Sequence, residues 1–272
     1  MVKLLISSVN VNPDELINKM NINTDAVLVN QCSENKEEQI GKGSFNVYVY
    51  HRDERGVGKS RNLCIDKSLE LFKDEDILLF SDEDIIYKDD YALVVENAFK
   101  KHKEAEMLLF NVKVAKERRT YWNTEYKKVG RFNSGRYPAY SIAVKCSVLK
   151  NSKVRFSLLF GGGAKYSNGE DSLFLMNCAK KKIKMFMTED VIGEEKYRES
   201  TWFKGFTEKF FFDRGVLFYF LYGRLALIWA LRFVLVKKEM FEGEIKRKQG
   251  FKLLIKGIQR GKKEYKIEKH KK

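Results

Sequence analysis

The alternation of short apolar segments with helical patterns restricts the fold of this chain more than any other feature of its sequence. Helical patterns begin at Pro13, at Ser60 and at Tyr91. Five strand-length segments rich in Val, Ile, Leu and aromatic residues occupy positions 3–9, 26–30, 45–50, 76–80 and 107–114. Strands that alternate with helices are joined by crossover connections, which make the strands mostly parallel. The sequence therefore predicts an α/β fold in which a mixed, mostly parallel sheet is flanked by helices.

A change of composition near residue 200 predicts two parts. Residues 1–200 are expected to form the α/β domain, in which Glu125–Val129 and Arg136–Val144 pair as antiparallel strands. Residues 201–272 are expected to form a helical, basic appendage, with the apolar stretch Gly215–Val236 followed by a lysine-rich tail. The tail repeats apolar residues at helical spacing, which predicts an amphipathic surface helix.

The composition indicates a folded, intracellular protein with a basic tail. Of the 272 residues, 44% are hydrophobic, which is enough to build a core. The four cysteines lie far apart and the three histidines are isolated, so neither residue type predicts a disulfide framework or a metal site. The N-terminal apolar stretch is too short for a signal peptide. The net charge is +15, of which residues 237–272 contribute +9, and this predicts a polyanionic partner, either nucleic acid or an anionic membrane face.

Three carboxylates directly follow one of the buried-type strands. The sequence Ile77–Ser81 leads into Asp82, Glu83 and Asp84, and in parallel sheets ligands bind beyond the carboxyl ends of the strands. Hard cations such as Mg²⁺ and Mn²⁺ prefer carboxylate and phosphate oxygens, so the cluster predicts a metal site. The alternative is a solvated acidic turn before the next helix.

Two other segments suggest ligand chemistry. Residues 55–62 place two glycines, Arg and Lys at a strand-to-helix junction, where backbone N–H groups favour phosphate. This segment half-resembles a phosphate-binding loop of an NTPase, but that motif requires a glycine at the position of Asp53. Glu170 and Asp171 begin a predicted helix that extends to residue 181. Acids at that position also satisfy the ordinary charge preference of a helix N-terminus.

In this order, the three signals resemble the motifs of family 2 glycosyltransferases with a GT-A fold. The resemblance covers residues 3–190. That family shows an apolar first strand, G-x-S-x-x-R-N, a strand that ends in D-x-D, and an E-D pair before a helix. The serine of the first motif is displaced here, because it directly precedes the arginine. The matching residues are Gly58, Arg61, Asn62, Asp82–Asp84 and Glu170–Asp171.

The resemblance implies an inverting, metal-dependent glycosyltransferase. It implies that a hexosyl or N-acetylhexosaminyl group moves from a nucleotide diphosphate sugar, expected to be a UDP-sugar, to a glycan or lipid-linked acceptor. Asp171 would be the catalytic base, with Glu170 as the competing candidate. Mn²⁺ or Mg²⁺ would be held by Asp84, with Asp82. The residues implied to bind the nucleotide sugar are Asn30, Gln31, Gly58, Arg61, Asn62, Asp82 and Glu83.

The chain departs from the family pattern at two places. The family usually ends its second strand with an Asp that contacts the nucleobase, whereas this chain has Asn30-Gln31, whose amides can both donate and accept hydrogen bonds. Processive members carry Q-x-x-R-W, and residues 198–202 do not match its spacing. We therefore expect a non-processive enzyme that adds one sugar during synthesis of a polysaccharide or glycolipid.

The apolar stretch Gly215–Val236 predicts attachment to a membrane surface. Its 22 residues would reach about 33 Å as a helix, but Arg224 lies close to its centre. We expect an interfacial segment at the cytoplasmic face of the plasma membrane, with the basic tail on anionic lipid. The aromatic residues expected at the headgroups are Phe218, Phe220, Trp229 and Phe233. The alternative is a helix buried against the domain.

Two other functions fit parts of the sequence. A P-loop-like NTPase would use the junction at residues 55–62 but lacks the required glycine. A basic nucleic-acid-binding protein would explain the tail, but carboxylates in the predicted ligand loops would repel phosphate. No nucleic-acid partner is therefore expected.

Overall fold

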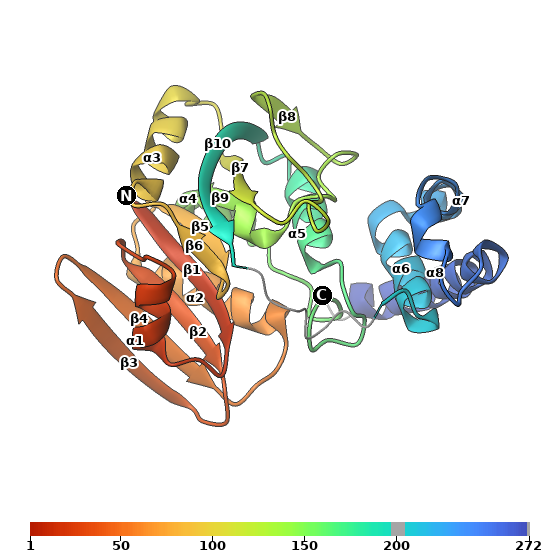
Figure 1. Ribbon diagram of the computed structural model, residues 1–272, viewed down its shortest axis with the longest axis horizontal. Coiled ribbons are helices and arrows are strands. Elements are labelled where there is room, and N and C mark those ends of the chain that lie inside the picture. The colour runs from red at the N-terminus through yellow and green to blue at the C-terminus, as the bar shows by residue number, and fades with distance from the viewer. Residues whose placement is uncertain (197–204, 271–272) are drawn as a thin grey trace. The chain divides into compact units, whose positions relative to one another are not determined.

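The computed structural model describes residues 1–196 and 205–270, which cluster into two compact units (Figure 1). The first unit combines Met1–Phe156 with Phe174–Glu199, and the second combines Ser157–Leu173 with Ser200–Lys272. The predicted boundary near residue 200 and the segment compared with Q-x-x-R-W lie outside the described residues. The first unit contains the sheet, and the second is largely helical.

Within the described residues, ten strands of the first unit form one mixed sheet. Their order is β3-β4-β2-β1-β5-β9-β7-β10-β6, with β8 paired to β10. Strands β1, β2, β4, β5, β7 and β10 run in one direction, which confirms the mostly parallel sheet. The bounds are β1 Val2–Val9, β2 Ala26–Gln31, β3 Lys36–Lys42, β4 Phe45–Arg52, β5 Ile77–Asp82, β6 Ile85–Tyr87, β7 Met107–Lys113, β8 Lys127–Val129, β9 Ile142–Lys145 and β10 Met185–Glu195.

Helices cover both faces of this sheet, so each central strand is buried on two sides. Along β1, Leu4 and Ile6 belong to the core cluster under α1 and α3, whereas Leu5 belongs to the cluster under α2, α4 and α5. This two-sided burial explains why the strands are almost continuously apolar instead of alternating. The helix bounds are α1 Pro13–Lys19, α2 Val57–Leu71, α3 Tyr91–Lys101, α4 Cys146–Ser152 and α5 Glu170–Lys180, with a 3₁₀ turn at Ala139–Ser141.

The predicted pairing of Glu125–Val129 with Arg136–Val144 is wrong. Strand β9 instead lies between β5 and β7, antiparallel to both, and β8 pairs with β10. The sheet is continuous only because β9 bridges β5 and β7, so this long-range pairing prevails over pairing with the nearer segment. Strand β3 was not predicted, because its polar sequence KEEQIGK lies at the exposed edge of the sheet.

The helical part of the second unit folds the apolar stretch back on itself. Helix α6 spans Glu208–Tyr222, a 3₁₀ turn spans Gly223–Leu225, and α7 spans Ala226–Val236. Tyr222 stacks on Trp229 with ring centroids 4.3 Å apart, and Phe218 meets Phe233 at 5.7 Å, so α6 and α7 form an antiparallel hairpin. The 3₁₀ turn Lys238–Phe241 leads to α8, which spans Arg247–His270.

Helices α6 and α8 pack so closely that glycine is required between them. A Cβ on Gly257 of α8 would lie 2.1 Å from the carbonyl oxygen of Phe212, and one on Gly215 of α6 would lie 2.2 Å from that of Leu254. The prediction that the tail is helical is confirmed by α8. Its apolar face packs against the core of the second unit, so that face is not available to a membrane. Leu254 is fully buried within the unit.

Two buried carboxylates tie the helices of this unit to its N-terminal loop. Asp213 of α6 accepts from the backbone N–H of Ser167 at 2.9 Å and from Lys209 at 2.6 Å. Glu264 of α8 accepts from Lys165 at 2.5 Å, which holds the pKa of Glu264 below its ordinary value. Both acids are thus paired, as buried charges must be.

Adding a methyl group at Gly257 tests the close packing of α6 and α8. We expect Gly257→Ala to lower the free energy of unfolding by about 1–3 kcal/mol, because the backbones must separate. The gain of about 1 kcal/mol in helix propensity acts in the opposite direction, so a net loss measures the clash. Thermal unfolding followed by circular dichroism measures it. Gly243→Ala is the control, since a Cβ there meets nothing within 4 Å. Equal stability of the two variants would contradict the packing.

Candidate functional site

The carboxyl ends of β1, β2, β4 and β5 lie side by side at one edge of the sheet. Ser7 of β1 is in register with Asp82 of β5, and Asn30 of β2 is in register with His51 of β4. Helix α2 begins five residues after β4 ends, so its N-terminus approaches the same edge. The expectation that these strand ends gather at one edge is confirmed.

An ion pair between Arg61 and Asp82 lies at this edge. The guanidinium Nη2 of Arg61 donates to both carboxylate oxygens of Asp82, at 2.9 and 3.1 Å. Arg61 is 4% exposed, and its guanidinium also lies 5.3 Å from the ring centroid of Phe156. The Asp82 side chain is 28% exposed. The carboxylate therefore balances a buried cation while one side remains accessible.

Glu83 has a structural partner inside the unit. Its Oε2 accepts from the backbone N–H of Val9 at 2.7 Å, and the residue is 6% exposed. This bond fastens the loop after β5 to the end of β1. The middle acid of the predicted cluster thus helps to shape the edge of the sheet.

Further ionisable groups surround Asp82 and Asp84. Glu195, at the end of β10, pairs with Arg118 at 2.8 Å. Burial raises the pKa of Glu195, and the negative charge of Asp82 raises it further, whereas Arg118 lowers it. Burial also raises the pKa of the Tyr140 hydroxyl, with smaller contributions from these carboxylates. The site therefore holds a third carboxylate and a neutral phenol.

The segment that matches the first motif forms the first turns of α2. Gly56 is the N-cap with φ +130°, and Gly58 and Arg61 are buried within the helix. Asn62 donates to the carbonyl of Phe156 at 3.0 Å and accepts from its N–H at 2.7 Å. Asn62 therefore positions the Phe156 ring against which the Arg61 guanidinium lies.

Asn30 and Gln31 are buried, and their amides have partners within the unit. Asn30 donates to the carbonyl of Val11 at 2.9 Å and accepts from its N–H at 3.2 Å. Gln31 accepts from the N–H of Gly56 at 2.8 Å, which holds the start of α2. These amides order the loops at the sheet edge. Their predicted contact with a nucleobase stays a prediction.

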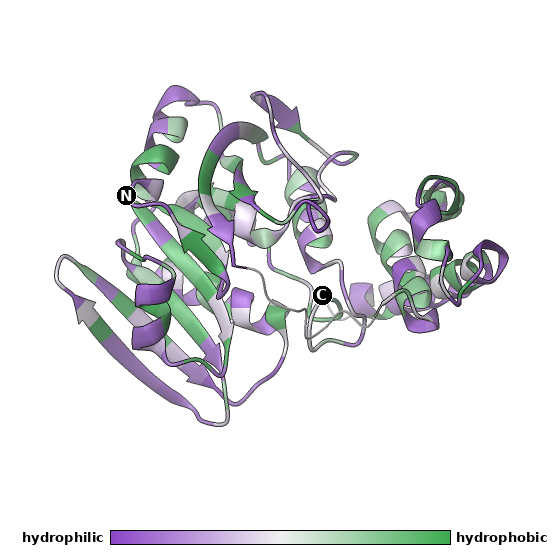
Figure 2. Cartoon of the chain, viewed as in Figure 1, coloured by the Kyte–Doolittle hydropathy of each residue, from purple (hydrophilic) through white to green (hydrophobic). Residues whose placement is uncertain are grey.

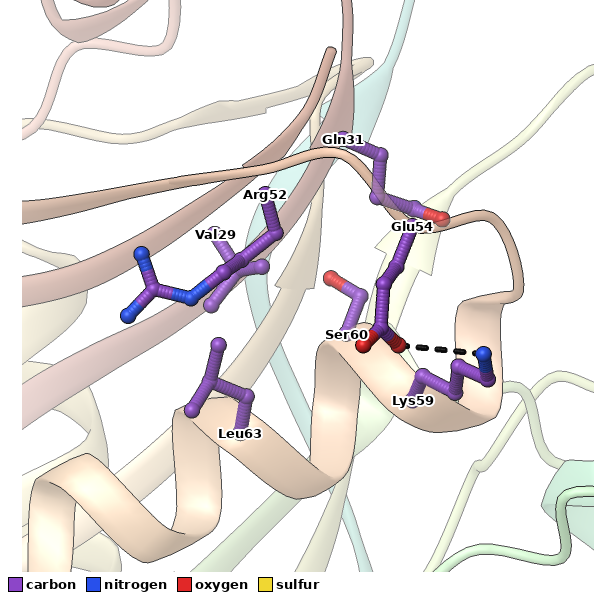
Figure 3. A pocket seen from close by; sticks show the side chains of 7 residues that line it. All are labelled: Val29, Gln31, Arg52, Glu54, Lys59, Ser60 and Leu63. Carbon is purple, nitrogen blue, oxygen red and sulfur yellow. Dashed lines mark ion pairs between the residues drawn. The ribbon is translucent and has the colours of Figure 1, made fainter. Parts of the chain in front are cut away.

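A pocket of about 200 Å³ opens between the ends of β2 and β4 and the start of α2 (Figure 3). Val29 and Leu63 give it apolar walls, and the cations Arg52 and Lys59 in its lining are paired with Glu37 and Glu54. Its volume is below the about 300–1,000 Å³ of typical small-molecule sites, so it has room for one part of a ligand. Lys59 pairs with Glu54, which also lines the pocket, at 3.0 Å.

Glu170 and Asp171 occupy the first turn of α5, so the predicted helix is confirmed. Gly169 precedes them with φ +110°, and a Cβ there would lie 2.4 Å from a methyl carbon of Leu217. This turn therefore requires glycine. The two acids belong to the second unit, whereas Asp82 and Asp84 belong to the first. That the four act on one substrate stays a prediction.

The donor set at the sheet edge fits a hard divalent cation by chemistry, because it consists of carboxylate oxygens. Arg61 donates to both oxygens of Asp82, and Asp84 is half-exposed. Among the described residues, neither acid belongs to a group of three metal-binding side chains within 4.8 Å. A cation here would need further ligands from a substrate or water.

Three residues at this edge were not predicted from the sequence. Glu195, Arg118 and Tyr140 come from positions far from the D-x-D segment and match no motif. The pairing of β10 with β6, and a hydrogen bond from the N–H of Lys196 to the carbonyl of Asp84 at 2.7 Å, bring the end of β10 close to the loop after β5.

No family model matches the sequence, and no curated protein matches it. The structure is similar to crystal structures of S. aureus TarS. The match to TarS 1–349 covers 95% of this chain and 71% of the TarS chain, with a TM-score of 0.51 and 15% sequence identity. TarS 1–349 in complex with UDP-GlcNAc gives a TM-score of 0.55 and 16% identity over 94% of this chain and 71% of that one. A further TarS structure matches with a TM-score of 0.53 and 14% sequence identity, and the match covers 94% of this chain and 42% of that one. The similarity confirms the predicted GT-A-type fold.

Removing the charge of Asp82 tests its role as the partner of buried Arg61. We expect Asp82→Asn to lower the free energy of unfolding by about 1–3 kcal/mol, because a buried cation loses its counter-charge while the shape of the site is kept. Urea unfolding measures the change. Asp66→Asn is the matched control: Asp66 pairs with Arg155 at 2.7 Å but is 53% exposed, so its loss should cost about 0–1 kcal/mol. An equal loss in both variants would count against the assignment.

Proposed function

We propose that this protein is a glycosyltransferase that moves a sugar from a UDP-sugar to an acceptor hydroxyl. The observation that carries the proposal is the fold similarity to TarS, a glycosyltransferase that was crystallised with UDP-GlcNAc. A fold alone does not define a reaction. The order of the motifs and the charged groups at the sheet edge supply the additional support.

The first unit is proposed to bind the donor. The pocket beside α2 offers apolar walls from Val29 and Leu63 and room for one part of the donor, which we assign to the uracil ring. Asp82, oriented by Arg61, accepts hydrogen bonds from donor hydroxyls. Gly58 and the N-terminus of α2 contribute backbone donors nearby.

Mn²⁺ or Mg²⁺ is proposed to bind at Asp84, with Asp82, and to supply positive charge to the leaving diphosphate. The chemistry of the donor set supports this assignment. The hexosyl or N-acetylhexosaminyl identity of the sugar is proposed on the UDP-GlcNAc bound to TarS.

Asp171 is proposed as the general base, with Glu170 as the alternative. The acceptor oxygen attacks the anomeric carbon while the bond from that carbon to the diphosphate oxygen breaks. The electron pair leaves with the diphosphate, and the acceptor proton passes to the carboxylate. Attack opposite to the leaving group inverts the anomeric configuration. We propose a single addition to a glycan or lipid-linked acceptor, as in non-processive family 2 enzymes.

A ligand panel and two substitutions test this proposal. UDP-GlcNAc and UDP-glucose, with and without Mn²⁺, should raise the unfolding temperature, whereas ATP and polyuridylate should not. We expect Asp171→Asn to lower the rate of sugar transfer about 10²- to 10⁴-fold, because no base then accepts the proton of the acceptor hydroxyl. The rise in unfolding temperature caused by the UDP-sugar should be unchanged in this variant. Release of UDP in the presence of acceptor measures transfer.

The comparison with Glu170→Gln decides which acid is the base. The variant that loses transfer but keeps donor binding identifies it, and Asp66→Asn serves as the control. A rise in unfolding temperature with ATP but not with UDP-sugars would favour the NTPase, and a rise with polyuridylate alone would favour nucleic-acid binding. Equal loss of binding and transfer in Asp171→Asn would contradict its role as a base.

We also propose that the second unit attaches the enzyme to an anionic membrane at its cytoplasmic face. The stretch Glu208–Val236 is long and apolar enough to cross a membrane by length and composition, but the helix breaks at Gly223, where φ is +56°. Phe218 is buried and Phe233 is half-buried against the hairpin core, so these two aromatic residues pack inside the unit and do not contribute to the proposed lipid contact.

One face of α7 provides the proposed lipid contact. Helix α7 is largely hydrophobic (Figure 2), and its exposed apolar residues recur at helical spacing. Arg232 lies among these exposed residues and Arg224 lies in the turn before α7, and the +9 charge of residues 237–272 complements anionic lipid. The exposed apolar residues are Leu225, Leu227, Ile228, Leu231, Leu235 and Val236.

Polar substitutions on this face test the membrane proposal. We expect the triple variant Leu227→Gln, Ile228→Gln and Leu231→Gln to lose most binding to phosphatidylglycerol vesicles at low salt, because it removes the apolar contact. Co-sedimentation measures binding. The control replaces two exposed leucines of the first unit, Leu71 and Leu93, with Gln. Equal binding by the triple variant, or a dimer that the triple substitution dissolves, would contradict lipid as the occupant.

A further inference from the structure

A thiol, an imidazole and a carboxylate converge at the sheet edge beside the pocket. Cys32 Sγ lies 3.6 Å from His51 Nδ1, and the same nitrogen lies 3.6 Å from Glu34 Oε1. All three atoms lie within 4.8 Å of one another. We propose that Cys32, Glu34 and His51 bind a Zn²⁺ ion, separate from the hard-cation site proposed at Asp84.

The spacing of these atoms matches a tetrahedral zinc site. Zinc binds thiolate sulfur at about 2.3 Å and imidazole nitrogen at about 2.0 Å, so two such ligands at the tetrahedral angle lie about 3.5 Å apart. The measured distance between Cys32 and His51 is 3.6 Å. A mixed sulfur, nitrogen and oxygen donor set suits zinc and disfavours Mg²⁺, which takes oxygen ligands.

A neighbouring carboxylate orients His51 for metal binding. Its Nε2 lies 3.0 Å from Glu38 Oε1, so the neutral ring carries its proton at Nε2 and keeps a lone pair at Nδ1, which lies 3.6 Å from both Cys32 Sγ and Glu34 Oε1. Histidines that bind zinc commonly donate their other ring N–H to a carboxylate in this way. Asn30 approaches Nδ1 at 3.3 Å, a long contact that a metal would replace.

The burial of the three side chains suits a metal site that is open to solvent on one side and held by the protein on the other. His51 is buried, Cys32 is half-buried and the Glu34 side chain is 59% exposed. The other three cysteines of the chain are buried, so Cys32 is the thiol that an ion from solution can reach. Three protein ligands leave the fourth position to water, as in open zinc sites.

Zinc at this position would brace the wall of the pocket. Cys32 follows Gln31 directly, and His51 precedes Arg52, and both of these neighbours line the pocket. An ion that joins Cys32 to His51 would clamp the end of β2 to the end of β4. The inference concerns a different site from the proposed transferase chemistry, and zinc binding is measured without any sugar substrate.

Titration of the metal-stripped full-length protein with Co²⁺ tests the site. We expect one equivalent of Co²⁺ to give a thiolate-to-metal charge-transfer band, and Zn²⁺ to abolish it by displacement. Cys32→Ser and His51→Gln should each weaken zinc binding at least a hundredfold, because each removes a ligand. Glu38→Gln should weaken it about 10- to 100-fold, since it removes only the orienting partner.

Glu37→Gln is the matched control for Glu34→Gln, because the two glutamates are three positions apart and their side chains are 57% and 59% exposed. The control should bind zinc as the parent does, and Glu34→Gln should bind it more weakly. Binding by unfolded thiols would persist in Cys32→Ser, which keeps three cysteines. Absence of the stoichiometric band in the parent, or its survival in Cys32→Ser, would overturn the proposal.

Discussion

The buried Arg61 guanidinium is the constraint on which the site depends. A cation that is 4% exposed requires an anion, and Asp82 supplies it by binding the same guanidinium nitrogen through both carboxylate oxygens. This pair links α2 to the end of β5, so the helix that carries the first motif and the strand that carries the second are held in one arrangement. The acidic segment after β5 is therefore not a free anionic cluster, because Asp82 is partly neutralised and Glu83 is bonded to Val9.

Local periodicity was sufficient to predict the parallel strands, because burial on both faces leaves an uninterrupted apolar run. It also predicted that Asn30 and Asp82 lie at one edge, since parallel strands end on the same side. It could not predict partners that depend on tertiary contacts. The polar strand β3 resembles a loop in composition, and β9 joins the sheet far from its sequence neighbours. Glu195 has no motif, and only the path of β10 brings it near Asp82.

The same dependence on tertiary contacts explains why the positions of the histidines in the sequence did not predict a metal site. Cys32 and His51 are 19 residues apart, with β3 and most of β4 between them, and nothing in their spacing resembles a zinc motif. The pairing of β2 with β4 places Asn30 opposite His51, and the β3–β4 hairpin places Glu38 beside the ring. Ligands on strands are brought together by register, which a one-dimensional spacing rule does not detect.

The apolar stretch of the second unit shows why composition alone could not separate a membrane segment from a buried helix. Gly223 divides it into two helices with different surroundings. Gly215 allows the backbone of α8 to approach α6, so α6 uses its apolar side chains within the unit. Helix α7 buries Ala226, Ala230 and Val234 and leaves the leucines of its opposite face exposed. Because small residues face inward and large ones outward, the hydrophobicity of α7 exceeds what its own packing requires. The lipid surface proposed for the second unit would cover these exposed side chains, and the +9 charge of residues 237–272 would favour anionic lipid.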